Sequence, residues 1–450
     1  MRSAAHSSVL PAYLLLSLVL GGSAQAIWGN LILQLLAATI LGWAILTHDP
    51  LKVSRGAGLL WILIGLALLL FAVQLVPLPP SFWMALPGRP RIVESFASVN
   101  LSLGWMPISL TPYKTLEAIP FLLPPLAFLA GALRFKPYRE AWLVAAMLAA
   151  TLAAILLGIL QVTSPDQSWY LYRFSAFGFA TGFFANSNHM GTLLLVSVPF
   201  LIALVSSQWA RAANVRLRSL ILALAAGAGG VILLGLLLNG SFAVLLLGAP
   251  VGLVSILLLP FERFRNRRRL WLAAALLAAM LALAVTFRAE FPRLVHNSVE
   301  TRVEIWGKSW AAVSEYWPSG SGIGSFQQIY QQQEVDGAAV DGTYVNDAHN
   351  DYLQLLVETG LAGVVMIVAF LCWWAGRVIV VWKSDPNVFA QAATIASAAI
   401  LLHSMVDYPL RTAAIAVVMA MCLAMMTRPR ITVRSQTVND LWPTRHLRVD

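Results

Sequence analysis

Charge is scarce in this sequence. Asp, Glu, Lys and Arg make up 11% of its 450 residues, whereas 59% of the residues are hydrophobic. An ordinary soluble domain carries roughly 25% charged residues, so this composition excludes a soluble globular protein and predicts a polytopic membrane protein. Cysteine is also scarce, and both Cys372 and Cys422 lie inside apolar runs. Their positions exclude a disulfide framework and indicate that they serve in packing.

A nucleotide-binding motif and a metal-binding cluster are absent as well. No G-x-x-x-x-G-K-[ST] pattern occurs, and "GSGIGSF" at Gly320–Phe326 lacks the lysine. We interpret that stretch as a glycine turn that follows a helix. No cluster of carboxylates predicts a metal site, so we expect neither a cofactor nor a metal. Any reaction is expected to use a preactivated substrate that is delivered in the membrane.

Long apolar runs define the expected architecture. Runs of about 17–25 residues are long enough to cross a bilayer as helices. The chain is therefore predicted to be an all-α polytopic membrane protein. Its twelve expected spans are 9–26, 27–46, 58–76, 116–133, 141–162, 189–209, 219–238, 242–260, 270–287, 358–380, 388–406 and 412–427. The corresponding regions are a nine-span part (1–287), a large periplasmic loop with a helix (288–357), three final spans (358–427) and a cytoplasmic tail (428–450).

The basic residues are distributed unevenly over the predicted loops. With the N-terminus inside, 21 of the 30 Lys and Arg residues lie on the inner side, and "FERFRNRRR" at Phe261–Arg269 supplies five of them. This positive-inside pattern predicts that both termini are cytoplasmic, and it explains the net charge of +10 without nucleic acid. The first span has an alternative, because "LLLSLVLGGSAQA" ends in a small-x-small pattern at Ala24 and Ala26 that a cleavable signal peptide also shows. We favour its retention as a span.

The polar chemistry gathers in the outer loops. The first is rich in Pro and Trp, which predicts a lid packed at the membrane interface. Arg89, Arg91 and Lys114 are its candidates for contact with an anionic lipid. The three outer loops are 77–115, 163–188 and 288–357.

The second outer loop ends in "GFFANSNHMGTLLL". Asn186 and Ser187 are explained as an ordinary N-terminal cap of the sixth span. His189 lies one residue further along, just at the hydrocarbon edge, where ionisable groups are costly and indicate function. Asn188 or His189, with Arg173 upstream, is therefore a candidate for lining a site.

The third outer loop contains an amphipathic helix, expected at about Val299–Tyr316. Arg302, Trp306 and Trp310 follow one another at i, i+4 spacing on this helix. A guanidinium fork beside Trp at a membrane surface suits a phosphate or diphosphate. The alternative is that Arg302 pairs with a neighbouring acid such as Glu304.

The stretch "VNDAHNDYLQLLVETG" at Val345–Gly360 leads into the tenth span. A helix is predicted from Asp347, with Asn346 or Asp347 as its N-cap. His349 would then occupy the first turn, where the helix dipole favours the neutral imidazole that a general base needs. Glu358 lies nine residues further on and is expected to tie the helix to a neighbour.

Four stretches resemble the O-antigen ligase and Wzy-type polymerase superfamily. "AHNDYLQLLVETGLAG" (Ala348–Gly363) resembles its signature H-N-x-x-L-x-x-x-x-E-x-G. "GFFANSNHMGTLL", "TRVEIWGKSWAAVSEYWPSGSGIGSF" and "LLHSMVDYPLRTAAIA" (Leu401–Ala416) resemble three further family segments in the same order. The resemblance covers residues from about 174 to 416.

The resemblance implies a GT-C-like, metal-independent, inverting glycosyltransferase of the bacterial inner membrane. Its donor would be a glycan on undecaprenyl diphosphate at the periplasmic leaflet, and its acceptor a hydroxyl of lipid A core, of a growing glycan or of a protein. His349 would activate the acceptor hydroxyl as the catalytic base or orient it, and Arg302, alone or with Arg173, would neutralise the diphosphate. The substrate-binding residues implied by the resemblance and the loop analysis are Arg173, Asn188, His189, Asn350, Tyr352, Asp407 and Arg411.

One position departs from the family pattern. The family has Ser-Arg before the eighth span, whereas "LLNGSFAVLLL" has Ser241 followed by Phe242. Either another arginine holds the diphosphate, or the donor differs. A lipid-linked glycan transporter or a non-catalytic assembly partner is the alternative in another class. A transporter would show inverted repeats and interrupted midplane helices, and we find neither pattern here.

Overall fold

The computed structural model describes residues 2–46, 54–134, 139–259, 291–334 and 345–428. Helices dominate these residues, as predicted, and one two-residue strand, β1 (Pro77–Leu78), pairs antiparallel with β2 (Met106–Pro107). The helices in chain order are α1 (Arg2–Leu20), α2 (Trp28–Leu46), α3 (Arg55–Gln74), α4 (Pro80–Met84), α5 (Pro90–Ser98), α6 (Pro112–Arg134), α7 (Glu140–Thr163), α8 (Ser187–Arg211), α9 (Val215–Asn239), α10 (Phe242–Ser255), η1 (Ile256–Leu258), α12 (Phe291–Tyr316), α13 (Phe326–Gln332), α14 (Asp351–Ser384), α15 (Val388–His403), η4 (Pro409–Arg411) and α16 (Ala413–Thr427).

Eleven of the twelve predicted spans coincide with apolar helices. Within the described residues, α2, α3, α6, α7, α8, α9 and α14 are long and apolar enough to cross a membrane. Four shorter apolar helices, in α1, α10 with η1, α15 and α16, match the other predicted spans. The predicted span 270–287 lies outside the described residues. The chain is an all-α polytopic membrane protein.

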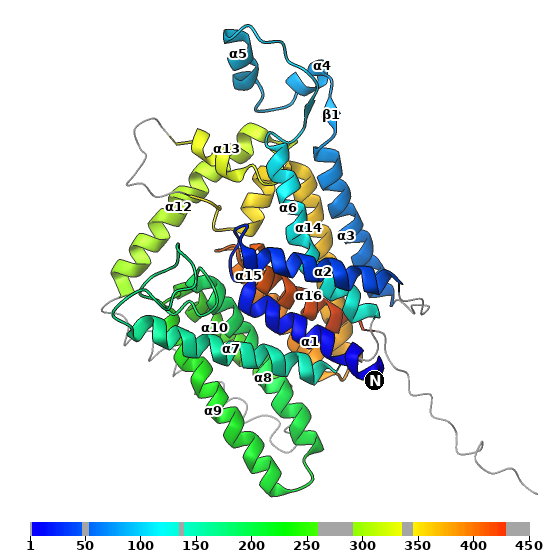
Figure 1. The fold of residues 1–450 in the computed structure, drawn as a ribbon, viewed down its shortest axis with the longest axis vertical. Helices are drawn as coiled ribbons and strands as arrows, with labels where there is room; N and C mark the ends of the chain where they lie inside the picture. Colours follow the sequence, from blue (N-terminus) through cyan, green and yellow to red (C-terminus); the bar gives the residue numbers. More distant parts are fainter. Residues whose placement is uncertain (1, 47–53, 135–138, 260–290, 335–344, 429–450) are drawn as a thin grey trace, which may run out of the picture.

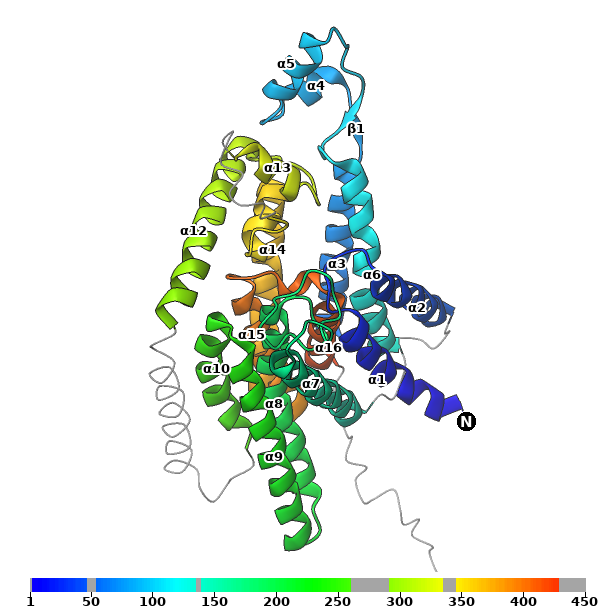
Figure 2. The ribbon, with the colours of Figure 1, turned by 60° about the vertical axis from the view of Figure 1, so that its left-hand side comes forward.

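The helices that project from the body do so at opposite ends of the molecule. In Figures 1 and 2, α4 and α5 form a small lobe at one end, above α3 and α6. The α8–α9 hairpin extends at the other end, and α12 lies obliquely beside the upper half of α14. The outer-loop helices thus gather on one side of the bundle.

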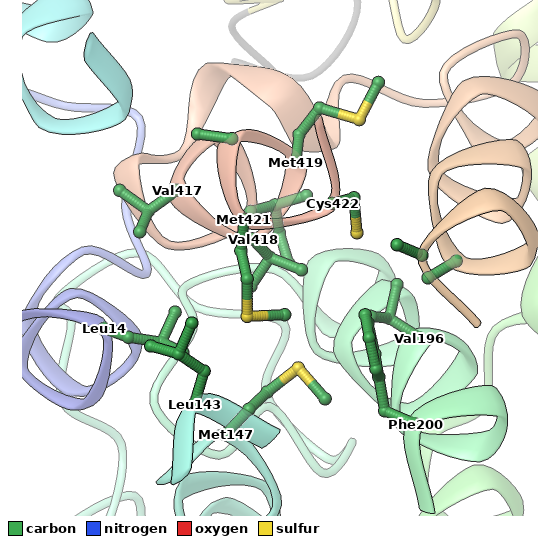
Figure 3. Close-up of a cluster of buried hydrophobic side chains, with 14 of the residues drawn as sticks. Leu14, Leu143, Met147, Val196, Phe200, Val417, Val418, Met419, Met421 and Cys422 are labelled. Carbon is green, nitrogen blue, oxygen red and sulfur yellow. The ribbon is translucent and has the colours of Figure 1, made fainter. Parts of the chain in front are cut away.

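The core is centred on α16, whose residues are almost all buried. It packs against α1, α6 and α15, and Figure 3 shows Val418, Met421 and Cys422 facing Leu14, Met147 and Phe200 of three other helices. Alanines recur on α15 and α16, and small residues let helix backbones approach closely where lipid surrounds the bundle. The expected packing role holds for Cys422, which is buried, and fails for Cys372, which is exposed on α14.

Polar N-cap residues fix the starts of the helices α8, α10, α14 and α16. Asn186 accepts a hydrogen bond from the Asn188 backbone N–H at 2.9 Å, as predicted, and begins α8. The side chains of Ser241, Asn350 and Thr412 cap α10, α14 and α16 in the same way. Such caps satisfy amide groups that have no partner inside the helix.

Helix α14 is kinked at Gly360, where the backbone adopts φ 56° and ψ −135°. A side chain here would collide with the carbonyl of Pro318, so glycine is required. The kink leaves the carbonyl of Glu358 to accept hydrogen bonds from the Gly322 N–H (2.8 Å) and the Gln74 side chain (3.0 Å). The predicted glycine turn therefore docks into the kink and joins α3, α12 and α14.

Most of the first outer loop is not buried, and α5 buries no residue, so the expected packed lid is not seen; Arg89 is one of the few fully buried residues of this loop. The Arg89 guanidinium donates to the Ile108 carbonyl at 2.6 Å and lies 5.1 Å from the Trp83 ring and 5.9 Å from the Tyr316 ring. Burial lowers the pKa of Arg89 to about 10. Because Arg89 is enclosed, the expectation that it contacts an anionic lipid is wrong.

Candidate active site

A cavity of about 1990 Å³ lies where the outer ends of several helices meet. Apolar side chains of α2, α3 and α6, including Leu31, Phe71 and Phe121, form one wall. The polar part of the lining comes from the starts of α8 and α14, from α12 and from η4. Its chemically active members are Asn186, Asn188, His189, Arg302, Asp347, His349, Glu358, Tyr408 and Arg411.

Asp407 is the centre of the first charged cluster beside this polar lining. It is fully buried between α15 and η4, and its Oδ1 accepts the Tyr408 backbone N–H at 2.9 Å. Oδ1 also lies 3.4 Å from His349 Nδ1 and 3.9 Å from His189 Nε2, and Oδ2 lies 4.0 Å from Arg302 Nη2. Three candidates that are far apart in sequence thus converge on one carboxylate.

The electrostatics of this cluster keep Asp407 ionised. Burial opposes its charge, but the contact with His349 and the nearby His189 and His403 outweigh burial and hold the pKa of the Asp407 carboxyl well below its usual range. His403, at the end of α15, is held by α8, since its Nδ1 lies 2.7 Å from Thr192 Oγ1. Asp407 therefore provides a fixed negative charge against the imidazole rings.

Tyr408 separates the two cavity histidines, and sequence reasoning missed it. Its ring meets the His189 ring edge-to-face at 4.8 Å and the His349 ring at 5.0 Å. Burial raises the pKa of the Tyr408 phenol above its ordinary value, so the hydroxyl stays protonated. The only signal in the sequence was its position next to Asp407.

The backbone around His349 differs from the prediction. Helix α14 begins at Asp351 with Asn350 as its N-cap, so the expected helix start at Asp347 is wrong. His349 precedes the helix in a left-handed conformation with φ 48°, which is uncommon for a residue with a side chain. The Asp351 N–H donates to the Ser404 carbonyl at 2.9 Å instead of forming an earlier turn. His349 therefore lies on a turn that tertiary contacts hold.

Arg302 lies on the amphipathic helix α12, as predicted. Ile305, Ser309 and Ala312 form the buried face of this helix. Glu304, the expected alternative partner of Arg302, instead pairs with Lys308 at 2.7 Å. The 4.0 Å between Arg302 and Asp407 exceeds a hydrogen bond, so the guanidinium is attracted by the carboxylate without being fixed by it.

A second cluster is centred on Arg411 in η4. Its Nε lies 3.6 Å from Asp347 Oδ1 and 3.6 Å from Asp351 Oδ1, and its Nη2 lies 3.8 Å from Glu358 Oε2. Burial opposes the charge of the guanidinium, but Glu358, Asp347 and Asp351 together raise the pKa of Arg411 above its ordinary value. The expectation that Glu358 ties α14 to a neighbouring element is met by this contact.

Comparison with known proteins finds a family model that matches part of the chain. Residues 227–368 match the family model described as O-antigen ligase. This matched part of the chain, less than a third of its length, is similar to the O-antigen ligase family. A search of curated proteins gives no match to the chain. The matched region of the O-antigen ligase model includes Arg302 and His349, whereas Asp407 and Arg411 lie beyond it.

Four of the expected substrate-binding residues are not among those that line the cavity: Arg173, Asn350, Tyr352 and Asp407, which is fully buried. Arg173 is exposed, with its guanidinium 5.5 Å from the Phe174 ring, and it is not among the residues that line the cavity. Asn350 caps α14, and the Tyr352 hydroxyl donates to the Leu401 carbonyl at 3.0 Å. Both of these side chains are engaged in holding the start of α14.

The position that departs from the family pattern faces the cavity. Phe242 lines it together with Ser241, whose side chain caps α10. A ring therefore stands where the O-antigen ligase pattern has a guanidinium. Arg302, Arg411 and Lys114 are the cationic residues of the cavity lining within the described part of the chain. Across residues 2–46, 54–134, 139–259, 291–334 and 345–428, no group of His, Cys, Asp and Glu is arranged to hold a metal ion.

Proposed function

We propose that this protein transfers a glycan from a polyprenyl diphosphate carrier, undecaprenyl diphosphate in bacteria, to an acceptor hydroxyl. The observation that carries the proposal is the convergence of His349 and Arg302 on Asp407 at the cavity wall. One group can take a proton from the acceptor, and the other can stabilise the departing diphosphate. The match of residues 227–368 to the O-antigen ligase model supports the same reaction class.

His349 acts as the general base. Its Nδ1 faces Asp407, so the carboxylate favours the tautomer with hydrogen on Nδ1 and leaves Nε2 to accept a proton. The acceptor oxygen attacks the anomeric carbon while its proton passes to Nε2. The bond between that carbon and the phosphate oxygen breaks, and the diphosphate leaves with the electron pair. Attack opposite to the leaving group inverts the anomeric configuration.

Arg302 stabilises the charge that develops on the leaving diphosphate. Its guanidinium lines the cavity and is held near Asp407 only at 4.0 Å, so it can present two parallel N–H groups to phosphate oxygens. No metal is required in this scheme. Lys114, 2.7 Å from Glu117 at the same cavity, adds positive charge near the mouth. Arg302 thus takes the place in the donor site that Phe242 leaves without a cation.

The apolar wall suits the lipid part of the donor. Leu31, Phe71 and Phe121 belong to helices that are apolar enough to span a membrane, so a prenyl chain can reach the polar wall from the bilayer. The bias of Lys and Arg toward the opposite loops supports a periplasmic site in the bacterial inner membrane. Lipid A core, a growing glycan on a second carrier and a protein hydroxyl are the three acceptor classes.

The direct test is a reaction of the purified protein with a lipid-diphosphate glycan. Acceptors are supplied separately as lipid A core and as a second donor molecule, with and without a chelator, and the product is identified by mass spectrometry. The proposal expects a new glycosidic product with one acceptor, inverted configuration by NMR, and no loss with the chelator. Carrier movement across liposomes without any product would instead support the transporter.

A further inference from the structure

We propose that Arg411 is a positioning residue that holds the turn carrying His349, and that it is not a ligand of the donor diphosphate. This inference rests on the proposed function for the catalytic role of His349. The turn itself and its contacts are independent of that role.

The first support is that Arg411 brackets His349. Its Nε lies 3.6 Å from the carboxylate of Asp347, two residues before the histidine, and 3.6 Å from the carboxylate of Asp351, two residues after it. One planar guanidinium therefore attracts both ends of a five-residue turn. Movement of either end would change the direction of the imidazole ring toward Asp407.

The second support is a network that joins this bracket to α14. Glu358 lies 3.8 Å from Arg411 Nη2 and 3.4 Å from Gln354 Nε2. Gln354 also donates to Asp347 at 3.3 Å and accepts the Ala348 N–H at 3.0 Å. The turn is thus fastened to the helix by side chains, since the residues before Asp351 do not form its first turn.

The third support is the unusual backbone of His349. A left-handed conformation at a residue with a side chain is costly, and it persists where surrounding contacts determine it. The Ala348 carbonyl accepts the Trp306 indole N–H at 3.1 Å, which fixes one side of the turn to α12. Arg411 fixes the other side to η4.

The charges of the cluster argue against an anionic ligand at Arg411. The carboxyl groups of Asp347, Asp351 and Glu358 already lie within 3.6–3.8 Å of this one guanidinium, so a diphosphate would have to compete with them. Arg302 faces a single carboxylate. The segment between α15 and α16 therefore supplies two supports for His349: Asp407 contacts its ring, and Arg411 holds its backbone.

The test uses Arg411→Gln, Arg411→Lys and Asp347→Asn in the full-length protein, with Arg216→Gln, an exposed arginine on α9 outside the cavity lining, as the matched control. Displacement of a catalytic group by about 1 Å can cost on the order of 10²-fold in rate, so we expect kcat to fall by about 10–10²-fold in Arg411→Gln and less in Arg411→Lys. The donor KM should stay within about threefold, because uniform donor binding is not removed.

A second measurement does not require transfer activity. Diethyl pyrocarbonate modifies accessible imidazoles, and mass spectrometry of the peptides gives the rate at His349 separately from that at His189 and His403. The rate at His349 should rise severalfold in Arg411→Gln and in the milder Asp347→Asn, and should match wild type in Arg216→Gln. Should Arg411→Gln fail to fold, Asp347→Asn alone decides the question.

The outcomes separate the two proposals. A raised donor KM with unchanged kcat and an unchanged modification rate would make Arg411 a diphosphate ligand and overturn the inference. Wild-type protein without transfer activity would overturn the proposed function. In that case the modification rates still show whether Arg411 holds the turn.

Discussion

The two charged clusters of the cavity have opposite compositions. Asp407 is one acid among His349, His189 and Arg302, whereas Arg411 is one base among Asp347, Asp351 and Glu358. The first cluster leaves proton-accepting and anion-binding groups directed at the cavity. The second cluster satisfies its single cation with carboxylates.

This difference shows how one short segment can serve chemistry and structure together. Asp407 and Arg411 are four residues apart in the connection between α15 and α16. A buried charge is costly unless it is paired, so each of them draws partners from other helices. The partners of Asp407 include groups able to act on a substrate, and the partners of Arg411 fix where those groups lie.

Removal of the His349 side chain, which belongs to the first cluster, should cause the largest loss of transfer rate. His349→Ala eliminates the proposed base, and loss of general base catalysis costs about 10²–10⁴-fold in rate. Expression and donor binding should be retained, because the base acts on the transition state. Transfer is measured with the purified variant beside His349→Gln, which keeps a hydrogen-bonding group. A rate above about a tenth of wild type in His349→Ala, too high for loss of a base, would reduce His349 to a structural residue.

Replacement of Arg302 should have the next largest effect. Arg302→Lys keeps the charge but loses the planar pair of donors, so we expect a loss of about tenfold or more in kcat/KM. Lys308→Arg, half-buried on the same helix and outside the cavity lining, is the control and should be near wild type. Turnover of the Lys variant near the wild-type level would mean that Arg302 is structural or serves only as a point charge.

The contribution of Asp407 to folding stability should depend on pH, and this dependence should be absent in Asp407→Asn. The pKa of Asp407 is lower in the folded chain than the ordinary value of about 3.9. The stabilisation is therefore fully present above about pH 4 and is lost as pH falls toward the folded pKa. The free energy of unfolding of the wild type should exceed that of Asp407→Asn by about 1–3 kcal/mol near neutral pH. This difference should disappear in acid. Thermal unfolding in detergent measures this difference. A difference independent of pH would contradict an ionised Asp407.

The substitutions with the smallest expected effect are single cysteines, which test the side of the membrane on which both clusters lie. Cysteines replace Ser314 on α12 and Ala213 between α8 and α9, both exposed, in a Cys372→Ser background. These variants should keep normal transfer activity. An impermeant maleimide should label the cysteine at position 314 in intact spheroplasts and the cysteine at position 213 only after permeabilisation. Labelling of both in intact spheroplasts would refute the predicted topology.

Much of the helical arrangement was predictable because apolar length and helix caps are local properties. The run at 141–162 became α7, and Asn186 caps α8 as expected. The start of α14 was predicted wrongly because Asn346 and Asp347 are, by residue type, as suitable for an N-cap as Asn350, which is the observed one. The Asp351 N–H bonds to Ser404, more than fifty residues away, and no local pattern contains that partner.

The site residues were predicted as separate groups, and their association was not. His349 and Arg302 stood out because ionisable side chains at a membrane edge are costly. Tyr408 was missed since an aromatic residue beside a span is usual at a membrane interface. Arg173 was a reasonable candidate by charge and position, yet it lies outside the cavity lining.

The sequence by itself determined the membrane class, the positions of the apolar helices and the amphipathic α12, since these follow from composition and periodicity along the chain. It also carried the family signature around His349. Only the tertiary structure decided that Asp407 joins His349, His189 and Arg302, and that Arg411 braces the turn between Asp347 and Asp351. Those contacts depend on helices that meet across the bundle, where the charge of one buried group selects its partners from distant segments.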